Sequence, residues 1–312
     1  MESIWNLELR KFPIFRFQRL TVKKGRTGSC VIPPRMSKYQ YRPPCRELSG
    51  YVQYYWMLDL EDVCPSCEPH RLTPQGFMEI VFYYRDSYKL ILSDGEESHP
   101  RATLYGQRTE FIDILPTGRV GLMSVVFTPV GVRDILHLPL NELINRYVSL
   151  EEVLGREGKD MEEQMMNLAS FDERVDGLET FLLGRLQRRN EFENNRMRMV
   201  MTRLLQCRGM FNVEQLAGYA CLSKKQFERV FSTYVGLMPK QYLRVIRFLY
   251  AVEFRNRMPE VDLATLAFHT GYYDAAHLAN EIKALTGHTS STLFQLMCFS
   301  EDADSIEWFL GV

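Results

Sequence analysis

Short segments rich in β-branched and aromatic residues occupy the chain between about residues 37 and 128. Clusters of Gly, Pro, Asp and Ser separate them, such as Pro43-Pro44 and Pro116-Thr117-Gly118. Strand-forming residues bounded by turn formers predict β-strands, and several short strands at this spacing are typical of a barrel or sandwich. The predicted strands are Tyr51–Leu60, Met78–Tyr84, Tyr88–Leu92 and Val120–Thr128.

Helical spacing of the apolar residues takes over after Pro139. The clearest example is Asp172–Arg189, which predicts an amphipathic helix that either packs on its own domain or forms a dimer surface. Polar Asn190–Asn195 then predicts a linker, and we place the domain boundary there. The apolar face of the helix consists of Val175, Leu178, Phe181, Leu182 and Leu186.

The C-terminal part contains an internal repeat. Leu216-Ala217 and Leu266-Ala267 match at an offset of 50, and Ser223 and Asp274 match at 51. Each copy has the order helix, tight turn, helix and a glycine stop.

Candidate caps begin each helix of the repeat. Asp262 and Asp274 are N-cap candidates in the second copy. Between the copies, Pro239–Asn256 has Pro near its start and apolar residues at helical spacing, which predicts one long connecting helix. The first copy contains two candidate capping boxes, Asn212 with Gln215 and Ser223 with Gln226.

These patterns predict an α+β protein. Residues 1–190 form a β-rich domain, barrel- or sandwich-like, with a following helix and helical character after about residue 139. Residues 195–298 form an all-α domain of seven helices with two helix-turn-helix motifs joined by a long helix. Residues 299–312 form an acidic tail.

Charge is distributed unevenly along the chain. Its 312 residues carry a net charge of −1, but residues 195–298 hold 13 Lys and Arg against seven Asp and Glu. This asymmetry is expected if only the C-terminal domain meets phosphate. The sequence contains no run of about 18 apolar residues, and Met1–Lys11 does not resemble a signal peptide, so we expect a cytoplasmic protein without membrane contact.

The second helix of each motif is suited to the DNA major groove, where base edges present a distinguishable pattern of donors and acceptors. In Ser223–Val235 the apolar residues Phe227, Val230 and Phe231 fall on one face. The other face is left with Lys224, Lys225, Glu228 and Arg229.

Residues 213–293, about a quarter of the chain, resemble the DNA-binding domain of the AraC/XylS family of bacterial transcription regulators. In the first copy and the connecting helix, the matching residues are Leu216-Ala217, Leu222-Ser223, Phe227-Glu228-Arg229-Val230-Phe231, Gly236, Pro239-Lys240-Gln241-Tyr242-Leu243, Arg247 and Ala251. In the second copy they are Leu266-Ala267, Gly271-Tyr272, Asp274, His277 and Gly287.

The resemblance implies a transcription regulator that binds double-stranded DNA, with RNA polymerase, a small-molecule effector and a second copy of the chain as further partners. We name activation as its role, and the sequence leaves repression open as the alternative. We expect no cofactor and no enzymatic activity, because the sequence has no phosphate loop, nucleophile elbow or metal-binding His pair. The DNA-binding residues that we expect are Lys224, Lys225, Glu228, Arg229, Ala275, Ala276, His277, Asn280 and Lys283.

The second copy departs from the family pattern. Asn280 stands where the family commonly has Arg, and Leu278 and Ile282 replace aromatic residues. We therefore expect the first copy to carry most of the sequence specificity and the second to hold the DNA backbone. The alternative is a co-regulator that acts mainly through protein contacts and binds DNA without sequence preference.

The N-terminal half resembles the effector or dimerisation domain that often precedes this module. The similarity implies an architecture and no particular ligand. Arg108 and His70 are candidates to orient an anionic ligand, and Tyr54, Trp56, Phe82 and Tyr84 either line a ligand site or, as we favour, fill the core. The residues that carry the similarity are Tyr41-Arg42-Pro43, Leu48, Tyr51-Val52, Tyr54-Tyr55-Trp56, Gly106-Gln107-Arg108, Pro129, Gly131 and Leu138-Pro139-Leu140.

The seven cysteines suggest free thiols in a reducing compartment. Cys64 and Cys67 have the spacing of a redox or zinc pair and are followed by His70, but no second pair completes a metal site, so we favour an ordinary loop. Cys207 and Cys221 are expected to be small core residues.

Overall fold

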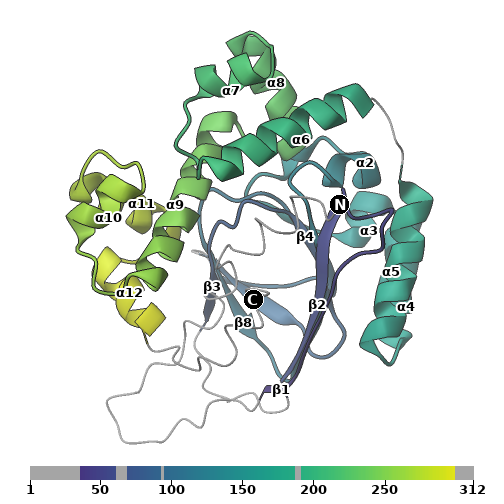
Figure 1. Ribbon diagram of the computed structural model, residues 1–312. Helices are drawn as coiled ribbons and strands as arrows, with labels where there is room; N and C mark the ends of the chain where they lie inside the picture. The colour runs from purple at the N-terminus through teal and green to yellow at the C-terminus, as the bar shows by residue number, and fades with distance from the viewer. Residues whose placement is uncertain (1–35, 61–68, 93–94, 187–190, 299–312) are drawn as a thin grey trace, which may run out of the picture.

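Two antiparallel sheets form the N-terminal half of the protein in the computed structural model, which describes residues 36–60, 69–92, 95–186 and 191–298 (Figure 1). The six-stranded sheet contains, in spatial order, β1 (Met36–Arg42), β2 (Val52–Leu60), β9 (Val120–Phe127), β4 (Glu79–Tyr83), β7 (Ala102–Tyr105) and β10 (Tyr147–Ser149). The four-stranded sheet contains β3 (His70–Leu72), β8 (Ile112–Pro116), β5 (Tyr88–Leu92) and β6 (Gly95–Ser98).

The four strands predicted from composition are confirmed as β2, β4, β5 and β9, each within two residues of the predicted ends. Helices predominate after residue 139, as predicted, and one short strand that the sequence pattern did not indicate lies among them. Strand β10 follows that point and pairs antiparallel with β7, with Tyr147 opposite Tyr105. Val148 is buried there, so a three-residue strand gains its stability from the sheet edge and the core beneath it.

The six-stranded sheet lies between two separate apolar clusters. One cluster is formed by residues of the two sheets that face each other, and the other lies between the six-stranded sheet and the helices. Tyr54 and Trp56 belong to the first cluster, whereas Phe82 belongs to the second and Tyr84 packs against it. The four aromatic residues thus contribute to two different cores, as the favoured core-filling interpretation requires, because side chains alternate along a strand and β2 and β4 are in different phase.

Helices cover the outer face of the six-stranded sheet. The longest is α5 (Phe171–Arg185), which confirms the predicted amphipathic helix and begins with a capping box of Ser170 and Glu173. Its apolar residues Val175 and Leu182 are 0% exposed in the cluster beneath the sheet, so α5 packs on its own domain. The other elements here are α2 (Val132–Leu136), the 3-10 turn η2 (Leu140–Leu143), α3 (Leu150–Leu154) and α4 (Arg156–Asn167).

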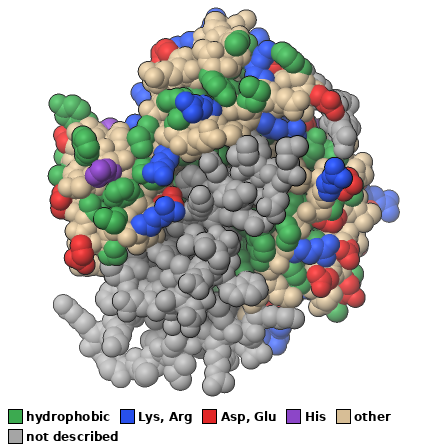
Figure 2. Space-filling view, viewed as in Figure 1, with side chains coloured by type: hydrophobic (Ala, Val, Ile, Leu, Met, Phe, Trp, Pro, Cys, Tyr) green, Lys and Arg blue, Asp and Glu red, His purple; other side chains and the backbone are tan. Residues whose placement is uncertain are grey.

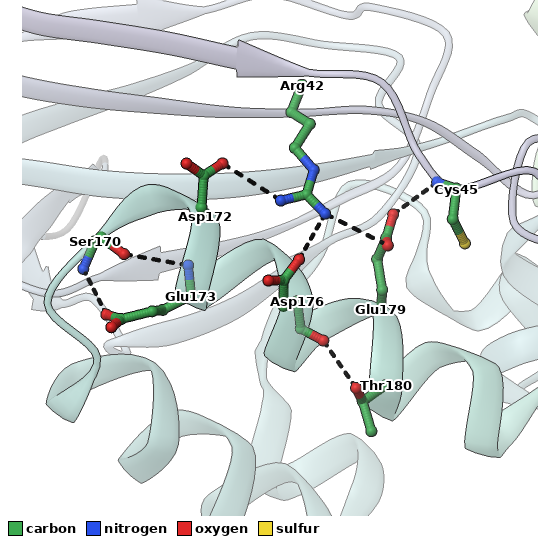
Figure 3. A network of polar contacts seen from close by, with 8 residues as sticks. All are labelled: Arg42, Cys45, Ser170, Asp172, Glu173, Asp176, Glu179 and Thr180. Atoms are coloured by element: carbon green, nitrogen blue, oxygen red, sulfur yellow. Dashed lines mark hydrogen bonds and ion pairs between the residues drawn. The ribbon is translucent and has the colours of Figure 1, made fainter.

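A polar network joins α5 to strand β1 (Figure 3). The Arg42 guanidinium lies 2.6 Å from Asp176, 3.3 Å from Asp172 and 3.6 Å from Glu179. Glu179 also accepts a hydrogen bond of 2.7 Å from the Cys45 backbone N–H. Because these groups are partly exposed, we attribute the stability of α5 to its apolar face and its orientation to Arg42.

Seven helices form the C-terminal half of the described chain, as predicted. They share one core that also takes in Val130 from the segment after β9. They are α6 (Glu191–Gln206), α7 (Val213–Tyr219), α8 (Lys224–Val235), α9 (Pro239–Arg257), α10 (Leu263–His269), α11 (Ala275–Thr286) and α12 (Ser290–Cys298). Among the described helices none is both long and apolar enough to cross a membrane.

The predicted linker at 190–195 is largely helical instead. Glu191 and Glu193 lie in the first turn of α6, where acidic side chains interact favourably with the helix dipole. Asn194 is 4% exposed and donates a 2.6 Å hydrogen bond to Asp134 of α2. The polar composition of this segment therefore did not indicate a linker. The segment is helical, and the Asn194 amide is buried against the N-terminal domain. The predicted acidic tail lies outside the described residues.

Candidate DNA-binding surface

Local hydrogen bonds define the first helix-turn-helix, formed by α7 and α8. Both predicted capping boxes are confirmed. The Asn212 side chain accepts from the Gln215 N–H at 2.8 Å and the Gln215 side chain accepts from the Asn212 N–H at 2.9 Å. Ser223 and Gln226 make the equivalent pair at 3.3 and 3.1 Å. These bonds satisfy N–H groups that would otherwise lack partners, so both helix starts are fixed.

The second helix-turn-helix, formed by α10 and α11, begins its helices with aspartates, as predicted. Asp262 accepts from the N–H groups of Ala264 and Thr265 at 2.9 Å each, and Asp274 accepts from the His277 N–H at 2.7 Å. Tyr273 is the extra residue that changes the repeat offset from 50 to 51, and it is 93% exposed beside this helix start. Tyr273 is not among the DNA-binding residues predicted from the sequence. The change of the repeat offset from 50 to 51 could have identified it.

The two turns share a left-handed residue at equivalent positions. Gly271 has φ +74° in the second turn, and Cys221 has φ 55° in the first. A residue with a Cβ is strained in this conformation, whereas glycine is not. Cys221 is exposed, so its expected place in the core is wrong, and Cys207 is half-buried.

Helix α9 joins the two units and holds them at its opposite ends (Figure 1). Its 19 residues span about 28 Å at about 1.5 Å per residue. The Nε atom of Arg244 on α9 lies 2.5 Å from Glu281 on α11, which fixes the second unit to the connecting helix.

The recognition helix of the first unit, α8, has one buried and one solvent-facing side. Phe227 and Phe231 are 0% exposed, and Val230 packs partly against the same core. Lys225 and Arg229 are exposed and Glu228 is half-buried. Long polar groups therefore project from the first turns of a helix whose other side is immobilised.

Lys224 makes a specific contact within the unit. Its ammonium lies 2.6 Å from the Glu214 carboxylate on α7, and this hydrogen bond raises the pKa of Lys224 and lowers that of Glu214. Both groups are exposed, so the ion pair is weak and a phosphate can compete for the lysine.

The recognition helix of the second unit, α11, presents shorter groups. Ala276, His277, Asn280 and Lys283 are exposed and Ala275 is half-buried. The remaining face is apolar: Leu278 and Ile282, which replace the aromatic residues of the family, are 0% and 1% exposed.

Figure 2 shows Lys and Arg side chains spread over the helix-turn-helix half of the molecule, with apolar side chains between them. The exposed apolar groups of this half include Phe268, 80% exposed on α10. All nine predicted DNA-binding residues belong to the two recognition helices, which present them from opposite ends of α9.

A second candidate site lies between the two sheets, where polar groups are buried among aromatic rings. The hydroxyls of Tyr83 and Tyr105 are 2.7 Å apart, and the Tyr105 hydroxyl is 2.6 Å from His99 Nε2. Burial lowers the pKa of His99 to about 4. The imidazole is therefore neutral at pH 7 and can accept a hydrogen bond at this nitrogen.

Arg108 occupies the same interior and is 8% exposed. Its guanidinium carbon lies 5.2 Å from the centre of the Tyr105 ring, and its Nη1 atom is buried without a hydrogen-bond partner among the described residues. Burial raises the pKa of the nearby Glu79 carboxyl, although Ser124, which donates to it at 2.6 Å, and Arg108 oppose the rise. Both polar atoms of the buried Gln107 amide also lack partners among those residues.

Both predicted anion ligands are on the side of this interior, with Arg108 buried in it. His70 lies on β3, half-buried, where alternation puts it on the same side as Leu72. Cys64 and Cys67 lie outside the described residues. Within the part of the chain that the structure describes, no group of three or more His, Cys, Asp or Glu side chains is arranged to hold a metal ion.

Comparison with known proteins identifies two families. Residues 216–295 match a family described as a helix-turn-helix domain, which is a DNA-binding class rather than a family of enzymes. Residues 40–149 match a family described as a domain of unknown function, DUF6597. No curated protein matches the chain.

Similar solved structures include ToxT from Vibrio cholerae and CuxR. An apo-form variant of ToxT is 10% identical, with 78% of this chain and 97% of that chain covered and a TM-score of 0.41. A second ToxT structure is also 10% identical, with 85% and 96% covered and a TM-score of 0.40. The AraC-like transcriptional activator CuxR is 13% identical, with 68% and 86% covered and a TM-score of 0.24. These scores are low, so the function is inferred from the helix-turn-helix match and from the geometry of the two units.

Replacing Cys221 by Gly is expected to stabilise the protein by up to about 1 kcal/mol, because the left-handed conformation costs an L-residue roughly 1–2 kcal/mol and glycine's extra backbone entropy offsets part of the gain. Urea unfolding followed by circular dichroism measures the difference. Cys207→Gly, at a position without positive φ, is the control and should be destabilising. Equal losses of stability in the two variants would contradict the assignment of strain to Cys221.

Replacing Arg229 by Ala is expected to weaken specific DNA binding by about 1–3 kcal/mol and to relax base preference at one position, if the guanidinium contacts a base. Asn280→Ala should have a smaller effect that is similar for all sequences. Fluorescence anisotropy on matched duplexes measures both. Arg156→Ala on α4, which removes an exposed arginine from the other domain, controls for net charge. Equal losses of specificity for Arg229→Ala and Asn280→Ala would contradict a dominant first unit.

Proposed function

We propose that this chain, which belongs to the AraC/XylS family of transcription regulators through its C-terminal domain, binds a specific DNA sequence with α8 and α11. The observation that carries the proposal is the pair of capped helix-turn-helix units at the two ends of α9, each with the first turns of its recognition helix exposed. Helices presented in this way enter the major groove with their N-terminal residues towards the bases.

The dimensions of the domain fit two contacts on one side of a duplex. A connecting helix of about 28 Å approaches the roughly 34 Å that separate major grooves along one DNA face. Since the separation falls short, a rigid pair would require the duplex to bend, at a cost of about 1–6 kcal/mol.

The two recognition helices differ in chemistry, and we assign them different roles. Lys225, Glu228 and Arg229 on α8 supply long donors and an acceptor for base edges. On α11, the two alanines offer apolar contact only, and Lys283 suits a phosphate. Most sequence specificity is therefore assigned to the first unit, with Lys224 and Lys225 adding affinity that depends on salt.

Affinity selection of fragmented genomic DNA on the purified full-length protein, at low and raised salt, tests this function. The expected result is a shared motif with two blocks about one helical turn, or roughly 34 Å, apart. A single block would show that only α8 recognises bases. Capture without a motif, abolished by modest salt, would contradict sequence-specific regulation and favour the co-regulator alternative.

The family resemblance extends the proposal to a cytoplasmic activator that contacts RNA polymerase, forms a homodimer and has no catalytic role. The apolar face of α5 is buried in its own chain, so a dimer would have to use another surface.

We also propose that the space between the two sheets receives a small effector with an anionic or hydrogen-bond-accepting group. A buried cation ordinarily has a charged or hydrogen-bonding partner, because burying it alone is costly. Arg108 Nη1 and the Gln107 amide lack partners among the described residues, so these groups would hold the polar end of the ligand. The surrounding tyrosine rings would contact its apolar part.

Small monocarboxylates of increasing size, each tested beside its neutral amide, are expected to raise the melting temperature of the wild-type protein selectively. One or more acids should stabilise it more than the matched amide, and Arg108→Gln should remove that difference. Differential scanning fluorimetry makes the measurement, with ligand-free Arg108→Gln as the control for folding. Equal responses to acids and amides throughout the series would refute Arg108 as the anchor.

A further inference from the structure

The C-terminal ends of both recognition helices contact the N-terminal domain. Helix α8 ends at Gly236, φ +89°, where a Cβ would lie 3.0 Å from the backbone oxygen of Leu140 in η2. Helix α11 ends at Gly287, φ +70°, where a Cβ would lie 2.5 Å from Arg71 Nη1 and 2.7 Å from the Phe111 ring. The two glycines thus stop the helices and also allow the close approach of the other domain.

Contacts with Asp113 and Phe111 orient Arg71 towards the end of α11. Its Nε and Nη2 atoms donate to the two carboxylate oxygens of Asp113 at 2.7 and 2.6 Å, which fixes the plane of the guanidinium. Its Nη1 atom donates to the backbone oxygen of Thr286 at 3.1 Å, and its carbon lies 3.8 Å from the centre of the Phe111 ring.

The Thr286 carbonyl is one of the last four of α11, which have no partner within the helix. The negative end of the helix dipole also lies there, so a cation is favoured. Arg71 therefore supplies both a hydrogen bond and a favourable charge from outside the domain. Asp113 and Phe111 restrict the guanidinium to the orientation that this contact needs.

The first unit is held differently, by burial. The Tyr234 ring at the end of α8 lies 4.3 Å from the Arg133 guanidinium carbon, and Val130 belongs to the C-terminal core. In the connecting helix, the buried Tyr242 hydroxyl donates to the Gly76 carbonyl at 2.9 Å. The first unit and α9 are thus joined to the N-terminal domain through shared core, whereas the Arg71 contact with the end of α11 is polar.

These contacts leave the DNA-facing ends of the helices free. Thr286 lies about 15 Å along the helix axis from Ala276, at about 1.5 Å per residue. Lys225, Arg229, Ala276 and Asn280 are all exposed while the domains are in contact. The N-terminal domain therefore positions the recognition helices without covering the surface that we assign to DNA.

We propose that Arg71 is a positioning residue that fixes the second recognition helix relative to the first and thereby sets the spacing between the two DNA blocks. This inference rests on the proposed DNA binding for its functional consequence, but the contact itself can be measured without DNA. Arg71 touches no base in this scheme. It acts through α11.

Amide hydrogen exchange of the DNA-free protein tests the structural part. In Arg71→Ala, peptides from 275–295 should exchange at least about fivefold faster, because the end of α11 opens more often. Peptides from 213–235 should be unchanged. Lys89→Ala, which removes an exposed ion pair with Glu96 on the same sheet, is the matched control. Unchanged exchange in 275–295 would overturn the proposal whatever the protein does with DNA.

DNA binding tests the functional part, on the selected two-block motif at its native spacing, with one or two base pairs inserted, and with the first block alone. The wild type should prefer the native spacing, and Arg71→Ala should lose about tenfold in affinity there, equivalent to about 1.4 kcal/mol, while binding the first block alone unchanged. Its preference for spacing should flatten, which a general loss of stability would not produce.

Asp113→Asn, which leaves Arg71 in place but loosens it, should change the spacing preference in the same direction and by less. A spacing profile identical to wild type in Arg71→Ala would overturn the proposal. Tighter binding by Arg71→Ala would also overturn it, because the contact would then restrain the second unit from DNA. Failure of the wild type to select any motif would refute the proposed function, and hydrogen exchange would then decide by itself whether Arg71 holds α11.

Discussion

The side chains of α9 are buried around most of its circumference, and Tyr242, Val245 and Phe248 are 0% exposed. A helix with this much buried apolar surface is stable in water only when other elements cover it. The two helix-turn-helix units cover its ends, and the N-terminal domain reaches it through Gly76, which accepts the Tyr242 hydrogen bond. The separation of the recognition helices, and with it any spacing of DNA contacts, follows from this burial.

The N-terminal domain combines two kinds of interior on the faces of one sheet. Against the helices the core is apolar, with Tyr55, Phe82 and Phe127 at 0% exposure. Between the sheets, the buried Arg108 and Glu79 lie among tyrosine rings. Burying a cationic group without a full set of hydrogen bonds destabilises a fold, and Arg108 Nη1 has no hydrogen-bond partner among the described residues. This atom is the observation on which our proposal of an effector between the sheets rests.

The strands that hold α11 are the strands that line this polar interior. On β3, Arg71 points towards the helical domain while its neighbour Leu72 belongs to the cluster between the sheets. On β8, Asp113 and Ile114 divide in the same way. Alternation along a strand therefore places the interior of one domain and a recognition helix of the other on opposite sides of a single sheet.

Local patterns in the sequence determined the helical domain. The capping residues such as Ser223 and Asp274, the proline at the start of α9 and the stop glycines each act within about four residues, so they are visible without a fold. The exposed positions of the recognition helices followed from the helical period for the same reason. The four longest apolar strands were equally clear, because a buried strand has a composition of its own.

Only the tertiary structure decided which elements meet. The phase of β2 against β4, the short strand β10, the helical start of α6 and the contact of Arg71 with Thr286 all depend on residues far apart in the chain. A strand of three residues, or an arginine that caps a helix 215 positions away, leaves no periodic signal. Sequence patterns show which side of a single helix or strand is buried. Packing across the whole molecule decides which other element covers that side.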